Sequence, residues 1–233
     1  TTQIVRPSNT AEIVRRAFKI AQTEKPGAVH IDLPENIAAM PVIAKPLVCD
    51  NIEKSFASFR SIEKAAAAIN DATNPLILVG NGAIRGNASE MLTKFASRLN
   101  IPVANTFMGK GVIPYPHPLA LWAVGLQQRD YISCGFDQTD LVIAIGYDLI
   151  EYSPKKWNPD GKIPVIHIGS TPAEVDSSYM PIAEVVGDIS DSLQEILYRC
   201  DRDGKPEPKV LSLRADIRSD YAQYANFRSS HRS

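Results

Sequence analysis

Runs of apolar residues along this chain alternate with stretches in which apolar positions recur at helical spacing. The runs at residues 76–79 and 141–145 contain no polar position, which predicts strands buried on both faces of a parallel sheet. Shorter runs predict further strands, and the intervening stretches predict helices because apolar residues recur every three or four positions. The expected strands are residues 76–79, 102–104, 120–124, 141–145, 165–168 and 184–186, and the expected helices are residues 62–73, 85–99, 131–136, 173–179 and 190–200.

This alternation of strands and helices predicts the fold class. Helices of such length between strands imply right-handed βαβ units, in which the strands are parallel. We therefore expect an α/β domain over residues 61–200. It would be a Rossmann-like, doubly wound parallel sheet of about six strands with helices on both faces.

The segments on either side of this domain have a different pattern. Residues 1–45 hold one predicted helix, capped by Ser8 or Asn9, and one predicted strand. One helix and one strand cannot bury their own apolar surface, so this segment is expected to be the end of a preceding domain. We expect residues 46–60 to be a linker and residues 201–233 to be a linker or tail.

Composition and charge exclude several classes of partner. The net charge is -1 and no run of lysine or arginine occurs, so nucleic acid and anionic membrane are not expected as partners. No apolar run approaches the roughly 20 residues of a membrane helix. The three cysteines, Cys49, Cys134 and Cys200, lie far apart without a CxxC pair, which favours free thiols in a reducing compartment. We expect a cytoplasmic protein.

A glycine-containing turn follows the first strand of the predicted domain. Gly80 and Gly82 lie in the run GNGAIRG, which opens a helix. Glycines at such a turn let backbone amides approach a phosphate, as in dinucleotide-binding proteins. The spacing is G-x-G-x-x-x-G, so it differs from the dinucleotide-binding pattern. A tight turn that needs no ligand would use the same glycines, and this alternative stays open.

Other residues at the ends of predicted strands extend this candidate site. Acids and aromatic residues follow the central strand in the run GYDLIEY, where ligands bind in open α/β sheets. The alternative is a packed, hydrogen-bonded loop anchored by Trp157, in which Asp148 and Glu151 accept backbone amides or pair with Lys155, Lys156 or Arg129. The candidate residues of this vestigial nucleotide cleft are Gly80, Gly82, Gly109, Gly146, Tyr147 and Asp148.

Residues typical of hydrolytic or metal chemistry are not arranged in recognisable motifs. The sequence contains no GxSxG run and no paired histidines at zinc-ligand spacing. We expect none of the four histidines to lie near a nucleophile. The sequence therefore predicts no catalytic residue and no metal ligand in this chain.

Three runs together carry a resemblance to a known family. GNGAIRG, the NTFMGKG loop and DLVIAIGYDLIEYSPKKWN resemble the middle domain of thiamine-diphosphate-dependent enzymes, and the last run is most similar to catabolic, FAD-independent acetolactate synthases. The opening helix and PGAVHIDLPENI resemble the end of the pyrimidine-binding domain, which would occupy residues 1–45. The resemblance extends to about Cys200.

The resemblance implies an activity for a full-length protein. Such an enzyme condenses two pyruvates to 2-acetolactate with loss of CO2, using thiamine diphosphate and Mg2+. In the family, the catalytic glutamate and the metal-binding GDG run belong to flanking domains, and this sequence contains no GDG. The resemblance therefore implies an inactive fragment of a homo-oligomer, a dimer or tetramer, acting on pyruvate or another 2-keto acid.

Two functional hypotheses follow for this chain. It is either a structural, non-catalytic middle domain or a FAD- or nucleotide-binding middle domain, as in biosynthetic acetolactate synthases or in another thiamine-diphosphate-dependent lyase or decarboxylase. Flavin-binding relatives carry an arginine-containing run after the central strand, whereas this chain has Asp148 and Glu151 there. Because two acids repel a pyrophosphate, bound FAD is not expected.

Overall fold

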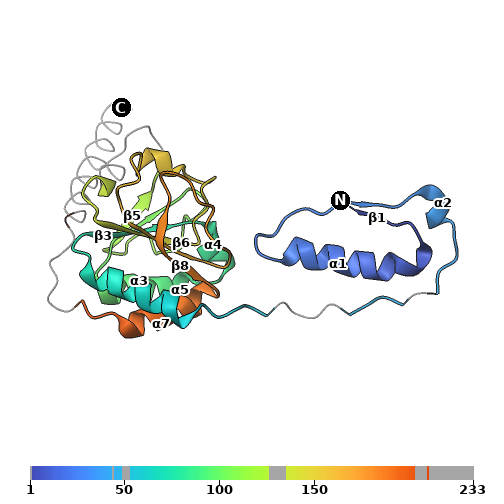
Figure 1. The fold of residues 1–233 in the computed structure, drawn as a ribbon, viewed down its shortest axis with the longest axis horizontal. Coiled ribbons are helices and arrows are strands. Elements are labelled where there is room, and N and C mark those ends of the chain that lie inside the picture. The colour runs from blue at the N-terminus through green and yellow to red at the C-terminus, as the bar shows by residue number, and fades with distance from the viewer. Residues whose placement is uncertain (1, 44, 49–52, 126–134, 203–208, 210–233) are drawn as a thin grey trace, which may run out of the picture. The chain divides into compact units, whose positions relative to one another are not determined.

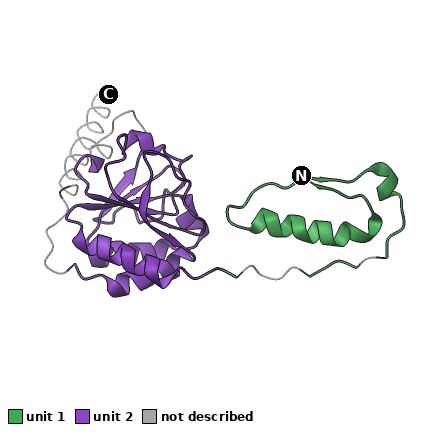
Figure 2. Ribbon diagram, viewed as in Figure 1, with its two compact units in different colours: residues 1–54 green, residues 55–233 purple. Residues whose placement is uncertain are grey.

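The computed structural model describes residues 2–43, 45–48, 53–125, 135–202 and 209. The chain divides into two compact units, Thr1–Lys54 and Ser55–Ser233, which are coloured separately in Figure 2. Each unit is described by itself.

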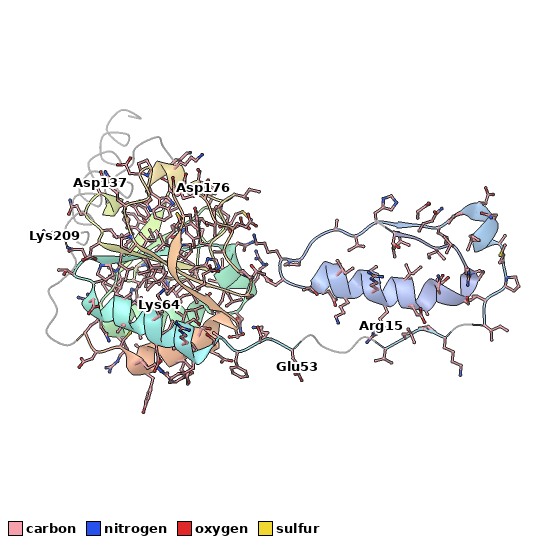
Figure 3. All side chains as sticks on the ribbon, in the orientation of Figure 1. Arg15, Glu53, Lys64, Asp137, Asp176 and Lys209 are labelled. Atoms are coloured by element: carbon pink, nitrogen blue, oxygen red, sulfur yellow. The ribbon has the colours of Figure 1, made fainter. Side chains whose placement is uncertain are left out.

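The first unit is small and has almost no core. Its elements are β1 (Thr2–Gln3), a 3-10 helix η1 (Pro7–Asn9), α1 (Thr10–Gln22), β2 (Ile31–Asp32) and α2 (Glu35–Ala38). The strands β1 and β2 pair in parallel. Arg15, labelled in Figure 3, lies on α1, and its Nε donates to the Val48 carbonyl at 2.9 Å. Among the described residues of this unit only Ile4 and Ala17 are buried, whereas Phe18 is 57% exposed. The unit therefore leaves apolar surface on α1 uncovered.

The second unit contains a six-stranded sheet in which every strand pair is parallel. Its strands are β3 (Pro75–Val79), β4 (Val103–Asn105), β5 (Ala120–Ala123), β6 (Leu141–Ile145), β7 (Val165–Gly169) and β8 (Pro181–Val186). The strands are arranged in the order β5-β4-β3-β6-β7-β8, which corresponds to 3-2-1-4-5-6 and is the order of dinucleotide-binding sheets (Figure 1). The predicted fold class is confirmed.

Helices and aromatic loops cover the two faces of this sheet. The helices are α3 (Phe59–Asp71), α4 (Asn81–Arg85), α5 (Ser89–Leu99) and α7 (Ile189–Arg199). Ile77 and Ile143 face a core built with α3, α5 and α7, whereas their neighbours Leu76 and Val142 face a second core rich in tyrosine and tryptophan. Alternate residues of each central strand thus belong to opposite faces, as the uninterrupted apolar runs predicted.

The helix ends and turns depart from the sequence-based expectations in three places. The sequence predicts Ser61 as the cap of this helix, but the Ser58 hydroxyl caps α3, since its oxygen accepts the Ser61 amide at 3.2 Å. The helix expected at 85–99 is divided into α4 and α5, and the left-handed Asn87 (φ 56°) lies between them. The prediction of a helix at residues 173–179 is wrong.

The stretch expected to form that helix contains a tight turn instead. Asp176 and Tyr179 form an isolated bridge, and the Asp176 carboxylate accepts the Ser178 amide at 2.8 Å. Aspartate and serine side chains compete for backbone amides in this way and so favour turns over helix. Most of the helix expected at 131–136 lies outside the described residues, although residues 135 and 136 are helical.

A buried arginine connects the ends of two helices. Nη1 of Arg202 donates to the carbonyls of Ile69 and Ala72 at 2.7 Å each, and Nε donates to the Leu99 carbonyl at 3.3 Å. These carbonyls terminate α3 and α5, where backbone acceptors lack helical partners. Burial lowers the pKa of the Arg202 guanidinium, and three of its N–H groups have carbonyl acceptors.

Candidate functional site

The direction of the strand order reverses between β3 and β6, so the crevice at their carboxyl ends is the expected ligand site. These strands pair from Pro75 with Leu141 to Val79 with Ile145. Gly80 and Gly146 therefore follow the two strands at the same edge of the sheet, as predicted. The Gly80 amide donates to the Ile145 carbonyl at 3.0 Å, which places the two strand ends side by side.

Close main-chain packing between the two turns explains the glycines at this edge. A Cβ on Gly146 would lie 2.1 Å from the Ala83 nitrogen, and one on Gly80 would lie 2.5 Å from the Gly146 oxygen. The Gly82 amide donates to the Gly146 carbonyl at 2.8 Å, and Gly146 has a positive φ of 57°. These contacts give each glycine a packing role that involves no ligand, which supports the tight-turn alternative.

Glu151 lies across the switch point and connects three loops. Its Oε1 and Oε2 lie 3.1 and 3.2 Å from the Asn81 amide, in the turn after β3. The carboxylate also accepts a short hydrogen bond from the Thr106 hydroxyl, which follows β4. Glu151 itself follows β6, so one carboxylate joins the ends of three adjacent strands. The expectation that Glu151 accepts a backbone amide is confirmed.

The loop after β4 is held at the same edge by Thr106. The Thr106 amide donates to the Val79 carbonyl at 2.8 Å, and its hydroxyl accepts the Gly109 amide at 3.0 Å. A Cβ on Gly109 would lie 2.6 Å from the Val79 oxygen, so this glycine also packs against the end of β3. Thr106 belongs to no candidate motif in the sequence. Its only signal was a hydroxyl directly after a predicted strand.

Aromatic residues behind the central strand form a packed cluster. Trp157 is 3% exposed, and its ring lies 5.2 Å from Phe136 and 6.3 Å from Tyr147, centroid to centroid. The Tyr147 hydroxyl donates to the Tyr152 carbonyl, and burial raises the pKa of the Tyr147 phenol above its usual range. The expectation that Trp157 anchors the loop by burial is confirmed.

The charged residues of this loop have local partners. The Asp148 carboxylate accepts the Ile150 amide at 3.2 Å. The ammonium of Lys156 lies 5.7 Å from the centre of the Tyr152 ring. Arg129, another expected partner of the acids, lies outside the described residues.

One histidine lies beside a hydroxyl, a contact that the sequence did not indicate. His117 Nε2 is 3.2 Å from Ser97 Oγ, while His117 Nδ1 accepts the Leu119 amide at 3.2 Å. With Nδ1 accepting, a neutral ring carries its proton on Nε2 and cannot take one from Ser97. Ser97 Oγ donates to the Thr93 carbonyl at 2.7 Å. The pair is therefore structural and does not form a base and nucleophile.

His167 is the second histidine with defined partners, and its role is also structural. Its Nδ1 lies 2.9 Å from the Tyr179 hydroxyl and its Nε2 lies 3.0 Å from the Thr171 carbonyl. Because a carbonyl can only accept, Nε2 carries the proton and Nδ1 accepts from the tyrosine. Both ring nitrogens of His167 are thus hydrogen-bonded within the fold.

The described residues contain no group of three or more histidine, cysteine, aspartate or glutamate side chains arranged to hold a metal ion. No helix in the described parts of the chain is long and apolar enough to cross a membrane. The arrangement at the switch point is therefore a hydrogen-bonded junction between loops, with neither a nucleophile nor a metal centre among the residues that form it.

Curated proteins similar to this chain share one description. A probable acetolactate synthase large subunit from Methanocaldococcus jannaschii is 37% identical over 205 residues, which cover 84% of this chain and 34% of the relative. The acetolactate synthase of Bacillus subtilis is 30% identical over 81% of this chain and 33% of its own length. The catabolic acetolactate synthase of Raoultella terrigena is also 30% identical, over 88% of this chain and 37% of its own length. The chain spans about a third of the length of these relatives.

Two solved structures have the same fold as this chain. One is described as a putative thiamin diphosphate-dependent enzyme from Mycobacterium smegmatis, with a TM-score of 0.72 and 20% identity over 89% of this chain and 40% of that one. Another is benzoylformate decarboxylase from Polynucleobacter necessarius, with a TM-score of 0.71 and 23% identity. The match covers 88% of this chain and 39% of that one. These likenesses show the fold.

A family model connects these observations. The model for the central domain of thiamine pyrophosphate enzymes matches residues 62–196, which include the whole six-stranded sheet and the Glu151 junction. The relatives and the strand order agree with that match. The chain belongs to the thiamine pyrophosphate enzyme family, and residues 62–196 are its central domain.

Proposed function

We propose that this chain is the non-catalytic central domain, with part of a preceding domain, of a thiamine-diphosphate-dependent acetolactate synthase. The complete enzyme would condense two pyruvates to 2-acetolactate with loss of CO2. The shared description of the curated relatives supports this substrate and reaction. On this proposal residues 1–45 end the pyrimidine-binding domain, residues 46–60 and 201–233 are linkers, and the protein is a cytoplasmic homo-oligomer.

The observation that carries the proposed lack of a bound nucleotide is the position of Glu151. In nucleotide-binding members of this fold class, backbone amides at the first βα turn bind a pyrophosphate. Here the Asn81 amide of that turn is bonded to the Glu151 carboxylate. A pyrophosphate at the same place would lose that donor and meet a negative charge. We therefore propose an enzyme of the FAD-independent type.

The residues of this chain do not fit a thiamine diphosphate and Mg2+ site. Among the described residues no cluster of metal-ligating side chains is present, and the whole sequence contains no GDG run. When bound, thiamine diphosphate stabilises the carbanion formed by decarboxylation of a 2-keto acid. We propose that residues outside this chain bind the cofactor, and that this domain supports their placement.

The test uses the longer protein that contains this chain. Purified with thiamine diphosphate and Mg2+, it should convert pyruvate to acetolactate, measured as acetoin after acid decarboxylation, and its visible spectrum should show no flavin bands. Decarboxylation of pyruvate to acetaldehyde without acetolactate would contradict the synthase assignment and favour a decarboxylase. Stoichiometric flavin in the spectrum would contradict the proposed role of Glu151.

A further inference from the structure

A surface pocket of about 300 Å³ lies in the second unit, between the start of α3 and α7. It is separate in sequence from the Glu151 junction, and the inference below does not depend on the proposed function. Two aromatic side chains, Phe56 and Phe59, line it together with two carboxylates of α7, Asp191 and Glu195. The Ser192 residue also lines the pocket. Aromatic rings and carboxylates thus share one concave surface.

The segment that carries Phe56 is fixed to the start of α7. The Asp188 amide donates to the Ser55 carbonyl at 2.8 Å. A Cβ on Gly187 would lie 2.6 Å from the Ala57 nitrogen, so the two backbones are in direct contact. Phe56 is nevertheless 82% exposed, although its neighbours on both sides are held in place. The Phe56 ring is therefore accessible to a ligand at the pocket.

One cation already occupies part of this surface and shows what chemistry it favours. The Arg199 guanidinium lies 4.8 Å from the centre of the Phe59 ring and donates to Glu195 Oε2 at 2.6 Å. A ring and a carboxylate together hold a planar cation, through cation–π attraction and a charged hydrogen bond. Phe56 and Asp191 repeat this combination of groups at the pocket, and no ion pair or hydrogen bond of the Asp191 carboxylate is found among the described residues.

A buried hydroxyl adds an independent observation. Ser192 is 2% exposed, and its Oγ has no hydrogen-bond partner among the described residues. Buried hydroxyl groups in proteins are ordinarily bonded to protein or to ordered water, so the partner of this one comes from outside the described residues. A ligand with several N–H donors would supply that partner and a countercharge for Asp191 at once.

We propose that this pocket binds a guanidinium group, stacked on Phe56 and hydrogen-bonded to Asp191 and Ser192. The guanidinium is planar, permanently charged and carries five donors, which matches a ring, a carboxylate and a hydroxyl better than a compact ammonium does. The group belongs either to a free guanidino compound or to an arginine side chain of a polypeptide. Both sources share this chemistry, and the experiment distinguishes them.

The test is an NMR titration of the ¹⁵N-labelled chain with N-acetyl-arginine methylamide. We expect saturable shifts at the amides of Phe56, Asp191 and Ser192, with a Kd of about 1 mM, because a single exposed cation site supplies little binding energy. The neutral isostere N-acetyl-citrulline methylamide should not bind. Shifts confined to other residues, or equal binding of the neutral compound, would overturn the proposal.

Variants locate the site. Asp191→Asn should weaken binding about 10-fold, the effect of losing one charged hydrogen bond. Glu90→Gln, which removes a carboxylate from the first turn of α5, is the matched control and should leave the affinity unchanged. Ser192→Ala should weaken binding with an unchanged circular dichroism spectrum. If Asp191→Asn binds as tightly as the unchanged chain, the proposal is wrong.

A second ligand, methylguanidinium, distinguishes a free guanidino compound from an arginine side chain as the source of the guanidinium group. Equal affinity for methylguanidinium and for the capped arginine assigns the pocket to a free guanidino compound. Affinity at least about 10-fold higher for the capped arginine assigns it to a polypeptide arginine, because backbone contacts then contribute about 1.4 kcal/mol. Sedimentation of the chain alone tests a second copy as that polypeptide, since self-association should disappear in the Asp191→Asn variant.

Discussion

Removing the Glu151 carboxylate should destabilise the central domain without affecting its other elements directly. In Glu151→Ala, the Asn81 amide and the Thr106 hydroxyl lose the acceptor that joins their loops. Hydrogen bonds to a charged group contribute about 1.5 to 3 kcal/mol each. Because Glu151 is half-buried, water replaces part of the lost interaction. We therefore expect the free energy of unfolding to fall by about 2 to 4 kcal/mol, less than the sum of two such bonds.

Urea unfolding followed by circular dichroism measures this change, provided the slope with denaturant stays constant. Glu151→Gln keeps one carbonyl oxygen as acceptor but not the charge, so we expect about half the loss. Asp160→Asn is the control, since Asp160 is an exposed carboxylate whose partner is Lys162 on the same loop. If Glu151→Ala and Asp160→Asn change the unfolding free energy equally, the junction does not hold the three loops together.

Four further predictions concern other parts of the chain. Trp157→Ala should lower the unfolding free energy by about 3 kcal/mol or more, the usual range for a buried large aromatic. If fluorescence quenching showed that the Trp157 indole is exposed to solvent, this prediction would be wrong. Burial raises the pKa of the Cys200 thiol to about 11. At a pH near 9.0, the ordinary pKa of a cysteine thiol, the folded chain should be alkylated at Cys200 far more slowly than the unfolded chain. Because the folded state holds this proton longer, the stability should fall as the pH rises from about 9 to about 11. Residues 1–45 should be cleaved first in limited proteolysis, since their described part buries only two side chains, and protection in a dilute monomer would contradict this. The 233-residue chain should not bind thiamine diphosphate with Mg2+ in a calorimetric titration, and micromolar binding would place the cofactor site inside it.

Much of the sheet could be predicted because its strands are buried on both faces. The runs at residues 76–79 and 141–145 have no polar position, and both are central strands of the sheet. Right-handed crossovers predicted that the strands are parallel, but the order of the strands in the sheet was not predicted. Helix starts were less predictable. Ser58 and Ser61 both suit a cap, and only the backbone conformation of residue 58 distinguishes them.

The candidate site was predictable in position and only partly in content. Sequence placed the glycines and the acidic loop at one edge, because strands of a parallel sheet end together. It could not show that the acceptor for Asn81 comes from residue 151, 70 positions away. Nor could it show Ser97 beside His117, 20 positions apart, since both contacts depend on how helices and loops pack. Long-range side-chain pairs of this kind leave no periodic pattern.

The Glu151 junction also bears on the proposal that this domain binds no nucleotide. The first βα turn of such a sheet directs backbone amides toward the crevice, and a buried amide without an acceptor is strongly unfavourable. A member that binds a pyrophosphate satisfies these donors with its ligand. This chain supplies the acceptor from the loop after the neighbouring strand β6, through a carboxylate that also accepts from Thr106. The acceptor is covalently part of the chain, so its stabilisation requires no ligand, and the central domain can act as a permanent scaffold whose loops stay joined whatever is bound elsewhere.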